Sequence, residues 1–291
     1  MLPSVDIFTC VTKLHPGYLN FKASFEQFQG WNVTAIGKGM PWKGWITRMI
    51  LYRDTSLWVS QHKDPEHVIV FLDAYDILCV RDSQDFLKTF HEIGYPIVAG
   101  SENICFFLTC RPTTRWKKIH KIHSYINGGC IIGKAQAIYE AFRWCIEKGY
   151  HHDDQIALSY YMDRYPYQIY LDKSRFIFND LFANSNVFQL EFPKKVSVSI
   201  KKQKYHPYFI HFPGLMVFSS SPVLFPWNIG KTPKNYKKIG THIIGNEFMD
   251  YQPIHMTIYR SSMIFVISCC VGFVLLSVYL LWFLNKYRNN S

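Results

Sequence analysis

VIVFLDAYDILCV, residues 68–80, is the most informative stretch of this sequence. Ten of its thirteen residues are β-branched or otherwise apolar, which is typical of a strand buried on both faces. Two carboxylates, Asp73 and Asp76, interrupt the run with only two residues between them. An ionised carboxylate buried without a partner costs roughly several kcal/mol, so these side chains require a partner of opposite charge.

Strand-like and helix-like stretches alternate around this run from residue 4 to residue 215. Strands are expected at residues 5–12, 31–37, 68–80, 96–101, 125–133, 167–172 and 208–212. Helices are expected at residues 47–62, 83–93, 135–149 and 154–165. This alternation predicts an α/β fold with a mixed, largely parallel sheet flanked by helices.

The two aspartates have the chemistry of a metal site. Val68 to Leu72 is uninterruptedly apolar, so Asp73 is expected near the carboxyl end of its strand, where ligands of open α/β sheets bind. Mg²⁺ and Mn²⁺ prefer carboxylate oxygens and often take phosphates and water as further ligands. The pair therefore fits a metal that holds a diphosphate. On spacing alone, a pair of strand-end turn residues that cap the next helix is the commoner interpretation of such a pattern.

Six blocks occur along the chain in a fixed order: IGKGMPWKGW (36–45), FLDAYDILCV (71–80), YINGGCIIG (125–133), HHDDQIALSYYM (151–162), LDKSRFIFNDL (171–181) and YFIHFPG (208–214). Through them, residues 4–215 resemble the glycosyltransferase domain of the lysyl hydroxylase and procollagen glycosyltransferase group. The resemblance implies a GT-A (Rossmann-like) fold that uses Mn²⁺, or Mg²⁺, and a UDP-sugar. It also implies transfer of a hexose to a hydroxyl acceptor on a protein, such as hydroxylysine, or on a glycan.

The same resemblance implies three groups of site residues. The metal ligands would be Asp73, Asp76 and His211. The catalytic acidic pair facing the sugar and the acceptor would be Asp153 and Asp154. The nucleotide-sugar would be bound by Thr12, Arg48, Tyr75, Asn127, Gly128 and Gly129.

Some of these residues have simpler structural interpretations. His211 lies in an apolar run, where a core histidine satisfied by a neighbour is the usual finding. Asp153 or Asp154 could cap the helix that follows, and the Gly128-Gly129 pair could form only a bulge or tight turn. Arg48 stands nearest to where the family has a phosphate-binding lysine, and the two cations are not equivalent.

The formal net charge of +11 is concentrated in lysine clusters at residues 194–204 and 231–238, which suit a solvated face, a phosphate-bearing partner or an anionic membrane. No nucleic-acid-binding module is recognisable, so no nucleic-acid partner is expected. None of the eight cysteines forms a C-x-x-C pair, which speaks against a zinc site. Cys10, Cys79 and Cys130 are expected to be reduced core residues, which favours a reducing compartment.

Residues 263–284 contain 22 residues without a charge, which is long enough to span a bilayer core of ~30 Å as a helix. The chain therefore divides into a glycosyltransferase-like domain (1–218), a basic juxtamembrane connector (219–262), a transmembrane helix (263–284) and a short basic tail (285–291). The N-terminus lacks the pattern of a signal peptide, so a tail anchor with the large domain in the cytosol is expected. The basic residues that flank the span leave a lumenal orientation open.

Two functions are consistent with these features. The first is a membrane-anchored, metal-dependent glycosyltransferase. The alternative is a membrane-displayed protein of the same fold that has lost turnover and serves as a binding, attachment or scaffold module. The presence of all five acidic and histidine site residues favours the first.

Overall fold

The computed structural model describes residues 5–102, 114–120, 124–151, 153–180, 188–191, 195–200, 203–211, 236–239 and 242–245. The chain divides into two units, Met1–Lys231 and Thr232–Ser291. In the second unit, β13 (Tyr236–Ile239) and β14 (His242–Gly245) pair as an antiparallel hairpin. The predicted transmembrane segment, residues 263–284, lies outside the described residues. Among the residues that the structure does describe, no helix has the length and apolarity needed to cross a bilayer.

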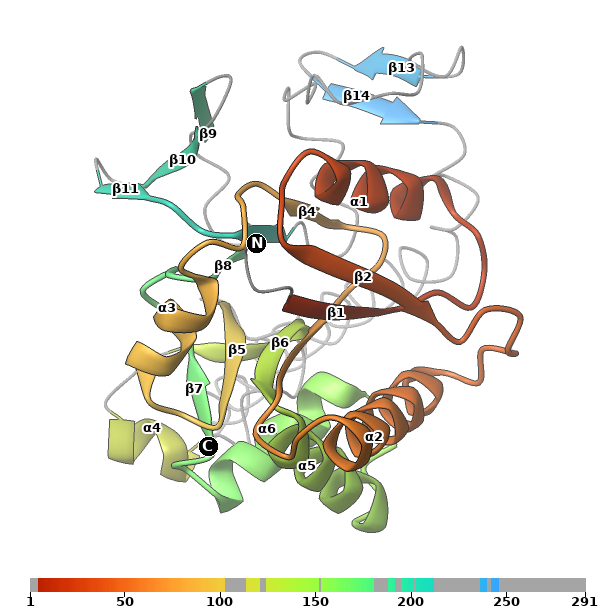
Figure 1. Ribbon diagram of the computed structural model, residues 1–291, viewed down its shortest axis with the longest axis vertical. Helices are drawn as coiled ribbons and strands as arrows, with labels where there is room; N and C mark the ends of the chain where they lie inside the picture. Colours follow the sequence, from red (N-terminus) through yellow and green to blue (C-terminus); the bar gives the residue numbers. More distant parts are fainter. Residues whose placement is uncertain are drawn as a thin grey trace, which may run out of the picture. The chain divides into compact units, whose positions relative to one another are not determined.

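A six-stranded sheet forms the centre of the first unit, in the order β2-β1-β3-β6-β5-β7 (Figure 1). Its strands are β1 (Val5–Cys10), β2 (Trp31–Ile36), β3 (Val68–Leu72), β5 (Ile97–Glu102), β6 (Tyr125–Lys134) and β7 (Ile169–Leu171). The pairs β1–β2, β1–β3 and β5–β7 are parallel, whereas β6 runs antiparallel to both β3 and β5. The predicted mixed α/β sheet is confirmed, and its antiparallel member is β6.

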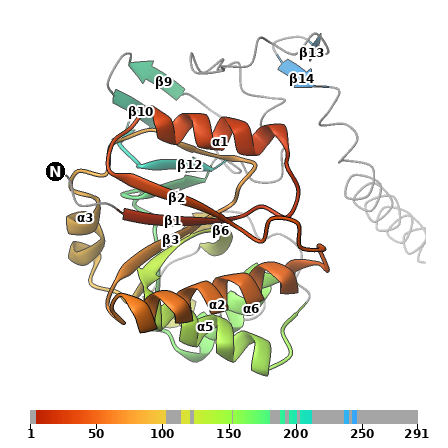
Figure 2. The same ribbon diagram turned by 45° about the vertical axis from the view of Figure 1, so that its right-hand side comes forward.

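Helices cover both faces of this sheet (Figure 2). They are α1 (Pro16–Glu26), α2 (Trp45–His62), α3 (Phe86–Ile93), α4 (Thr114–His120), α5 (Ala135–Glu147) and α6 (Asp154–Arg164). Helices α2, α5 and α6 lie on one face and α1 lies on the other. The four predicted helices correspond to α2, α3, α5 and α6, while α1 and α4 were not predicted. Helix α1 begins at Pro16, a residue that suits the first helical position.

The prediction of one continuous strand over residues 68–80 is wrong. The chain leaves the central sheet after Leu72, turns through Asp73–Asp76 and enters a second sheet as β4 (Ile77–Cys79). That sheet has the order β4-β12-β8, with β12 (Phe209–His211) between β4 and β8 (Phe178–Asp180). The turn takes both carboxylates out of the strand ladder, where they would have been buried in an apolar layer. A third, antiparallel sheet contains β9 (Phe188–Glu191), β10 (Lys195–Ile200) and β11 (Gln203–Tyr205).

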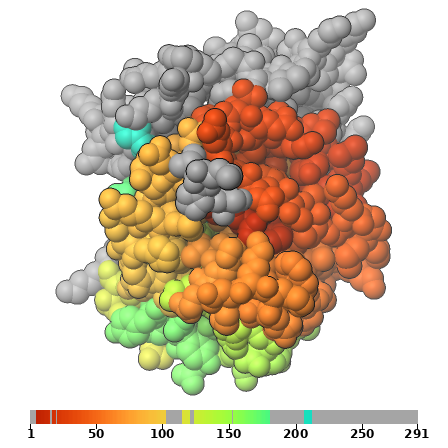
Figure 3. Space-filling model, viewed as in Figure 1, coloured from red at the N-terminus to blue at the C-terminus, as the bar shows by residue number. Residues whose placement is uncertain are grey.

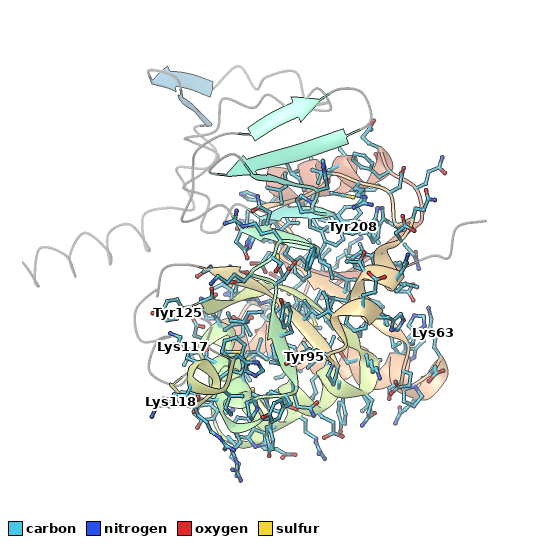
Figure 4. All side chains as sticks on the ribbon, turned by 90° about the vertical axis from the view of Figure 1, so that its left-hand side faces the viewer. Lys63, Tyr95, Lys117, Lys118, Tyr125 and Tyr208 are labelled. Carbon is cyan, nitrogen blue, oxygen red and sulfur yellow. The ribbon has the colours of Figure 1, made fainter. Side chains whose placement is uncertain are left out.

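Strand β3 is buried on both faces, as its composition predicts. Ile69 and Phe71 pack into the core beside α2, α5 and α6, while Val70 and Leu72 pack into the core beside α1 and the second sheet. This alternation follows from the two-residue period of a strand. Tyr208, labelled in Figure 4, is buried in the same core as Val70 and Leu72, and its ring centroid lies 5.0 Å from that of Phe86. The end of β3 is therefore held rigidly between two packed layers.

The four described free cysteines, Cys10, Cys79, Cys130 and Cys145, are all buried. Burial raises the pKa of the Cys10 thiol to about 11, so this thiol stays protonated at neutral pH. The prediction that Cys10, Cys79 and Cys130 are reduced core residues is confirmed.

Candidate active site

The candidate site lies at the carboxyl ends of β1 and β3. These strands are parallel, so they end at the same edge of the sheet. Because β6 is antiparallel to β3, its first half returns to that edge and its glycines meet the turn after β3. The backbone N–H of Asp73 donates to the carbonyl of Gly129 at 2.8 Å, which extends the strand ladder into the acidic turn. Figure 3 shows the same side of the molecule as Figure 1, formed largely by residues of α1, α2 and α3.

Asp73, Asp76 and His211 come together at this edge, although His211 lies more than a hundred residues further along the chain. Nε2 of His211 is 3.4 Å from Oδ1 of Asp76 and 3.9 Å from Oδ2 of Asp73. One ligand atom from each of the three residues lies within 4.8 Å of the others. Strand β12 achieves this by pairing with β4, which places His211 opposite Ile77, directly after the acidic turn.

Two buried atoms of this group fit a bound cation. Oδ1 of Asp76 and Nε2 of His211 are buried, and neither has a hydrogen-bond partner within the described part of the chain. A buried polar atom without a partner costs about 1–3 kcal/mol, so such atoms call for an explanation, and an ion is one. Two carboxylates and a neutral imidazole form a donor set that suits Mn²⁺. The residues present therefore fit a divalent metal.

The protonation behaviour of the group agrees with this fit. Burial raises the pKa of Asp76, and the neighbouring His211 opposes that rise only in part. Burial alone would lower the pKa of His211, but Cys130, Asp76 and Asp180 together raise it well above its usual value. The cluster therefore favours a bound positive charge, which a proton or a metal ion can supply.

Gly129 gives the ligands the space they occupy. A Cβ at this position would lie 2.5 Å from Oδ2 of Asp73 and 2.7 Å from Cε1 of His211. We expect Gly129→Ala to fold but to displace both ligands, and so to weaken Mn²⁺ binding by about 10–100-fold, the range typical when the surroundings of metal ligands are disturbed. Titration of Mn²⁺ followed by electron paramagnetic resonance measures this. Lys88→Ala is the control, because the Lys88 side chain is exposed on α3 and pairs with Glu92 of the same helix. Unchanged affinity in Gly129→Ala would contradict the geometry.

Arg48 of α2 lies between two carboxylates. Its guanidinium pairs with Asp73 and with Asp154, and Nε is 2.6 Å from Oδ2 of Asp154. The guanidinium also lies 4.6 Å from the ring centroid of Trp45. Although burial would lower the pKa of Arg48, the two carboxylates hold it well above its usual value. Arg48 thus joins the end of β3 to the start of α6, and its predicted contact with a phosphate remains a prediction.

The predicted acidic pair divides into two different environments. Asp153 caps α6, because its Oδ1 accepts from the backbone N–H of Ile156 at 2.9 Å. Asp154 is only 2% exposed and faces Arg48. Burial raises the pKa of Asp154 to about 6, and Arg48 partly opposes this rise. Of the two, Asp154 is the carboxylate directed toward the site, and its catalytic role stays a prediction.

Asn127, Gly128 and Gly129 are held by a network of amides. Oδ1 of Asn127 accepts from the N–H of Gly129 at 2.8 Å, and Oε1 of Gln155 accepts from the N–H of Gly128 at 3.1 Å. Both side-chain amides donate in turn to the carboxylate of the buried Glu102. The register of β5 and β6 shifts directly after Asn127, between the pairs Gly100–Asn127 and Ala99–Ile131, so the suggested bulge is present along with the close backbone approach.

The two remaining predicted residues, Thr12 and Tyr75, come from two adjoining segments. Thr12 is half-buried in the loop after β1, and Tyr75 lies in the acidic turn, where its hydroxyl donates to the carbonyl of Lys13 at 2.9 Å. The acidic turn is also tightly packed against α1, because a Cβ on Gly17 would clash with the carbonyl oxygen of Tyr75. The hydroxyl of Tyr75 thus joins the acidic turn to the loop that contains Thr12.

Sequence reasoning missed Glu102, Gln155 and Asp180. Glu102 and Asp180 are buried, and each is the last residue of its strand. Their partners, Asn127 and His211, lie far along the chain, so no local pattern distinguished these carboxylates from others at strand ends.

Three comparisons with known proteins bear on this site. A family model described as "PLOD GT domain" matches residues 2–218. The human multifunctional procollagen lysine hydroxylase and glycosyltransferase LH3 is 25% identical over 200 residues, which is 65% of this chain and 26% of that protein. The corresponding Caenorhabditis elegans protein, named as a multifunctional procollagen lysine hydroxylase and glycosyltransferase, is 27% identical over 202 residues, again 65% of this chain and 26% of that protein. The chain thus spans about a quarter of the length of these relatives.

Among solved structures, a glycosyltransferase involved in glycosylation of the major capsid of PBCV-1 aligns with a TM-score of 0.44 at 11% identity, covering 73% of this chain and 94% of that one. The galactosyltransferase LgtC aligns with a TM-score of 0.39 at 13% identity, covering 72% and 88%. The family model spans nearly the whole of the first unit, including every predicted site residue. The chain therefore belongs to the PLOD GT domain family, the glycosyltransferase domain of the lysyl hydroxylase group.

Proposed function

We propose that this chain is a metal-dependent glycosyltransferase that moves a hexose from a UDP-sugar to a hydroxyl acceptor on a protein or a glycan. The observation that carries the proposal is a pair of buried atoms that make no hydrogen bond within the described chain, Oδ1 of Asp76 and Nε2 of His211, which lie 3.4 Å apart beside Asp73. This arrangement lies at the sheet edge where α/β proteins bind nucleotides. Family membership supplies the reaction class.

In this proposal Asp73, Asp76 and His211 would hold Mn²⁺ or Mg²⁺, and the ion would supply positive charge to the diphosphate leaving group. Asp154, oriented by Arg48, accepts hydrogen bonds from the transferred sugar and offsets positive charge that develops at its anomeric carbon. The paired glycines after Asn127 leave room for the sugar against the backbone of β6. Thr12 and Tyr75 line the nucleoside end. The acceptor oxygen then bonds to the anomeric carbon as the bond to the diphosphate oxygen breaks, UDP leaves, and the hydroxyl proton passes to water or to the departing diphosphate.

Calorimetric titration of UDP tests the proposal. With Mn²⁺ present we expect saturable binding of UDP, and with chelator present we expect the heat of binding to vanish. A screen of donor hydrolysis across UDP-sugars then identifies the hexose. If UDP does not bind in either condition, the chain is a binding or scaffold module that keeps the fold without the activity.

We further propose that residues 263–284 anchor the domain in a membrane, with residues 219–262 as a basic connector and residues 285–291 as a short tail. The support is the length of the uncharged run and the basic residues on both sides of it. The domain would then face the cytosol. Fractionation of the full chain against a chain that ends at residue 262 tests anchoring, and protease protection of the 1–218 domain in intact vesicles tests the orientation. Cleavage of that domain by protease added outside the vesicles is the expected result.

A further inference from the structure

The metal-binding histidine has a buried carboxylate on its other side. Asp180 is the last residue of β8, which runs parallel to β12, and the register places Asp180 directly beside His211. Oδ1 of Asp180 is 2.6 Å from Nδ1 of His211. Their side chains are 1% and 3% exposed, so this contact is shielded from water.

We propose that Asp180 is a positioning residue, which fixes His211 as the Nδ1–H tautomer and directs Nε2 toward Asp73 and Asp76. This inference rests on the proposed function, because it concerns the same metal site. An ionised carboxylate can only accept hydrogen bonds, so the proton between these residues belongs to Nδ1. In the neutral ring, the lone pair is then on Nε2, the atom that lies 3.4 Å from Asp76 and 3.9 Å from Asp73. A carboxylate behind a ligating histidine sets both the tautomer and the basicity of the ligand.

The carboxylate of Asp180 occupies space beside Gly100 that a larger residue would fill. A Cβ at Gly100 of β5 would lie 2.6 Å from Oδ2 of Asp180, so only glycine at that position leaves the carboxylate in place. Gly100 sits where the β5–β6 register shifts, next to the bulge that also presents Asn127. Oδ2 of Asp180 has no hydrogen-bond partner in the described residues. A buried carboxylate with one oxygen left without a hydrogen bond lowers the stability of the fold. The contact that its other oxygen makes here is with Nδ1 of His211, which orients the imidazole ring.

A competing arrangement must be distinguished. Cys130, Asp180 and His211 also bring one ligand atom each within 4.8 Å of one another. An ion there would make Asp180 a direct ligand and would need the Cys130 thiolate, a softer ligand than Mn²⁺ prefers. The two arrangements make opposite predictions for Cys130. Loss of its thiol should weaken metal binding only if the ion lies between Cys130, Asp180 and His211.

Two measurements on the full chain test the inference. The affinity for Mn²⁺, followed by electron paramagnetic resonance without donor, should fall about 10–100-fold in Asp180→Ala. It should fall less in Asp180→Asn, whose amide oxygen can still accept from Nδ1–H. Cys130→Ala should bind Mn²⁺ within about twofold of the wild type, whereas an equal loss in that variant would favour the competing arrangement and overturn ours.

The second measurement needs no metal. Nitrogen-15 spectra of histidine-labelled protein, recorded at alkaline pH where the ring is neutral, should show His211 as the Nδ1–H tautomer in the wild type and as a mixture in Asp180→Ala. His211→Gln assigns the signal. A wild-type Nε2–H tautomer, or a folded Asp180→Ala protein with the wild-type tautomer and affinity, would overturn the inference. If the wild type binds no Mn²⁺, the proposed function fails, and the tautomer still decides whether Asp180 orients the ring.

Discussion

Replacing Asp76 by alanine is expected to lower turnover of the UDP-sugar donor by on the order of 10³-fold. In the proposed reaction a bound metal would supply roughly 4 kcal/mol of charge stabilisation at the diphosphate, and about 1.4 kcal/mol corresponds to each factor of ten in rate. Asp76 is buried and contributes one of the two carboxylates of the site, so the ion cannot be held by the remaining two residues with the same geometry. Initial rates of UDP release with saturating donor and Mn²⁺ measure the effect.

The matched control is Asp54→Ala. Asp54 lies on α2 with its side chain 56% exposed and pairs with its neighbour Arg53, so its loss should leave the rate within about twofold. Calorimetry should show that Asp76→Ala no longer binds UDP in the presence of Mn²⁺, while its thermal unfolding remains cooperative. A folded Asp76→Ala protein that keeps a tenth or more of the wild-type rate would rule out this carboxylate as a metal ligand.

Much of the site could be predicted from the sequence because the signal was local. The apolar run from Val68 to Leu72 specified a strand, and Asp73 directly after it specified where a ligand would bind. His211 could be proposed only through the resemblance, since a histidine in an apolar strand is ordinarily a core residue. The pairing of β12 with β4 then explains why it reaches the acidic turn, and that pairing depends on contacts across more than a hundred residues.

The missed features have a common physical origin. The direction of β6 decides that Gly129 meets Asp73, yet strand composition is the same for parallel and antiparallel neighbours. The turn that splits residues 68–80 contains no glycine or proline, so its only turn-forming residues are Asp73 and Asp76, whose carboxylates would also be costly to bury in a strand. Asp180 and Glu102 acquire their roles from hydrogen bonds to distant residues, which no local pattern reports.

The pairing of Arg48 leads to the largest expected effect on stability. Arg48 is 6% exposed and faces Asp73 and Asp154, so Arg48→Met leaves Asp154 as a buried carboxylate without its cation. Breaking a buried pair in this way costs about 3–5 kcal/mol of unfolding free energy. Denaturation in urea at pH 7.5 measures the loss. Arg48→Lys should lose less unfolding free energy than Arg48→Met, because lysine keeps the positive charge. It should still be less stable than the wild type, because lysine cannot make the forked contact with both carboxylates.

The pH dependence of Arg48→Met separates loss of charge from loss of packing. Burial already raises the pKa of Asp154 to about 6 with Arg48 present, and removal of the cation should raise it further. A carboxyl group whose pKa is higher in the folded than in the unfolded state binds a proton more readily when folded, so stability falls as the pH rises through the folded pKa. The deficit of Arg48→Met relative to the wild type should therefore be smaller at pH 5 than at pH 8. Adding Asp154→Asn should recover part of the stability at pH 8, whereas a deficit independent of pH would mean that Arg48 acts through packing against Trp45 alone.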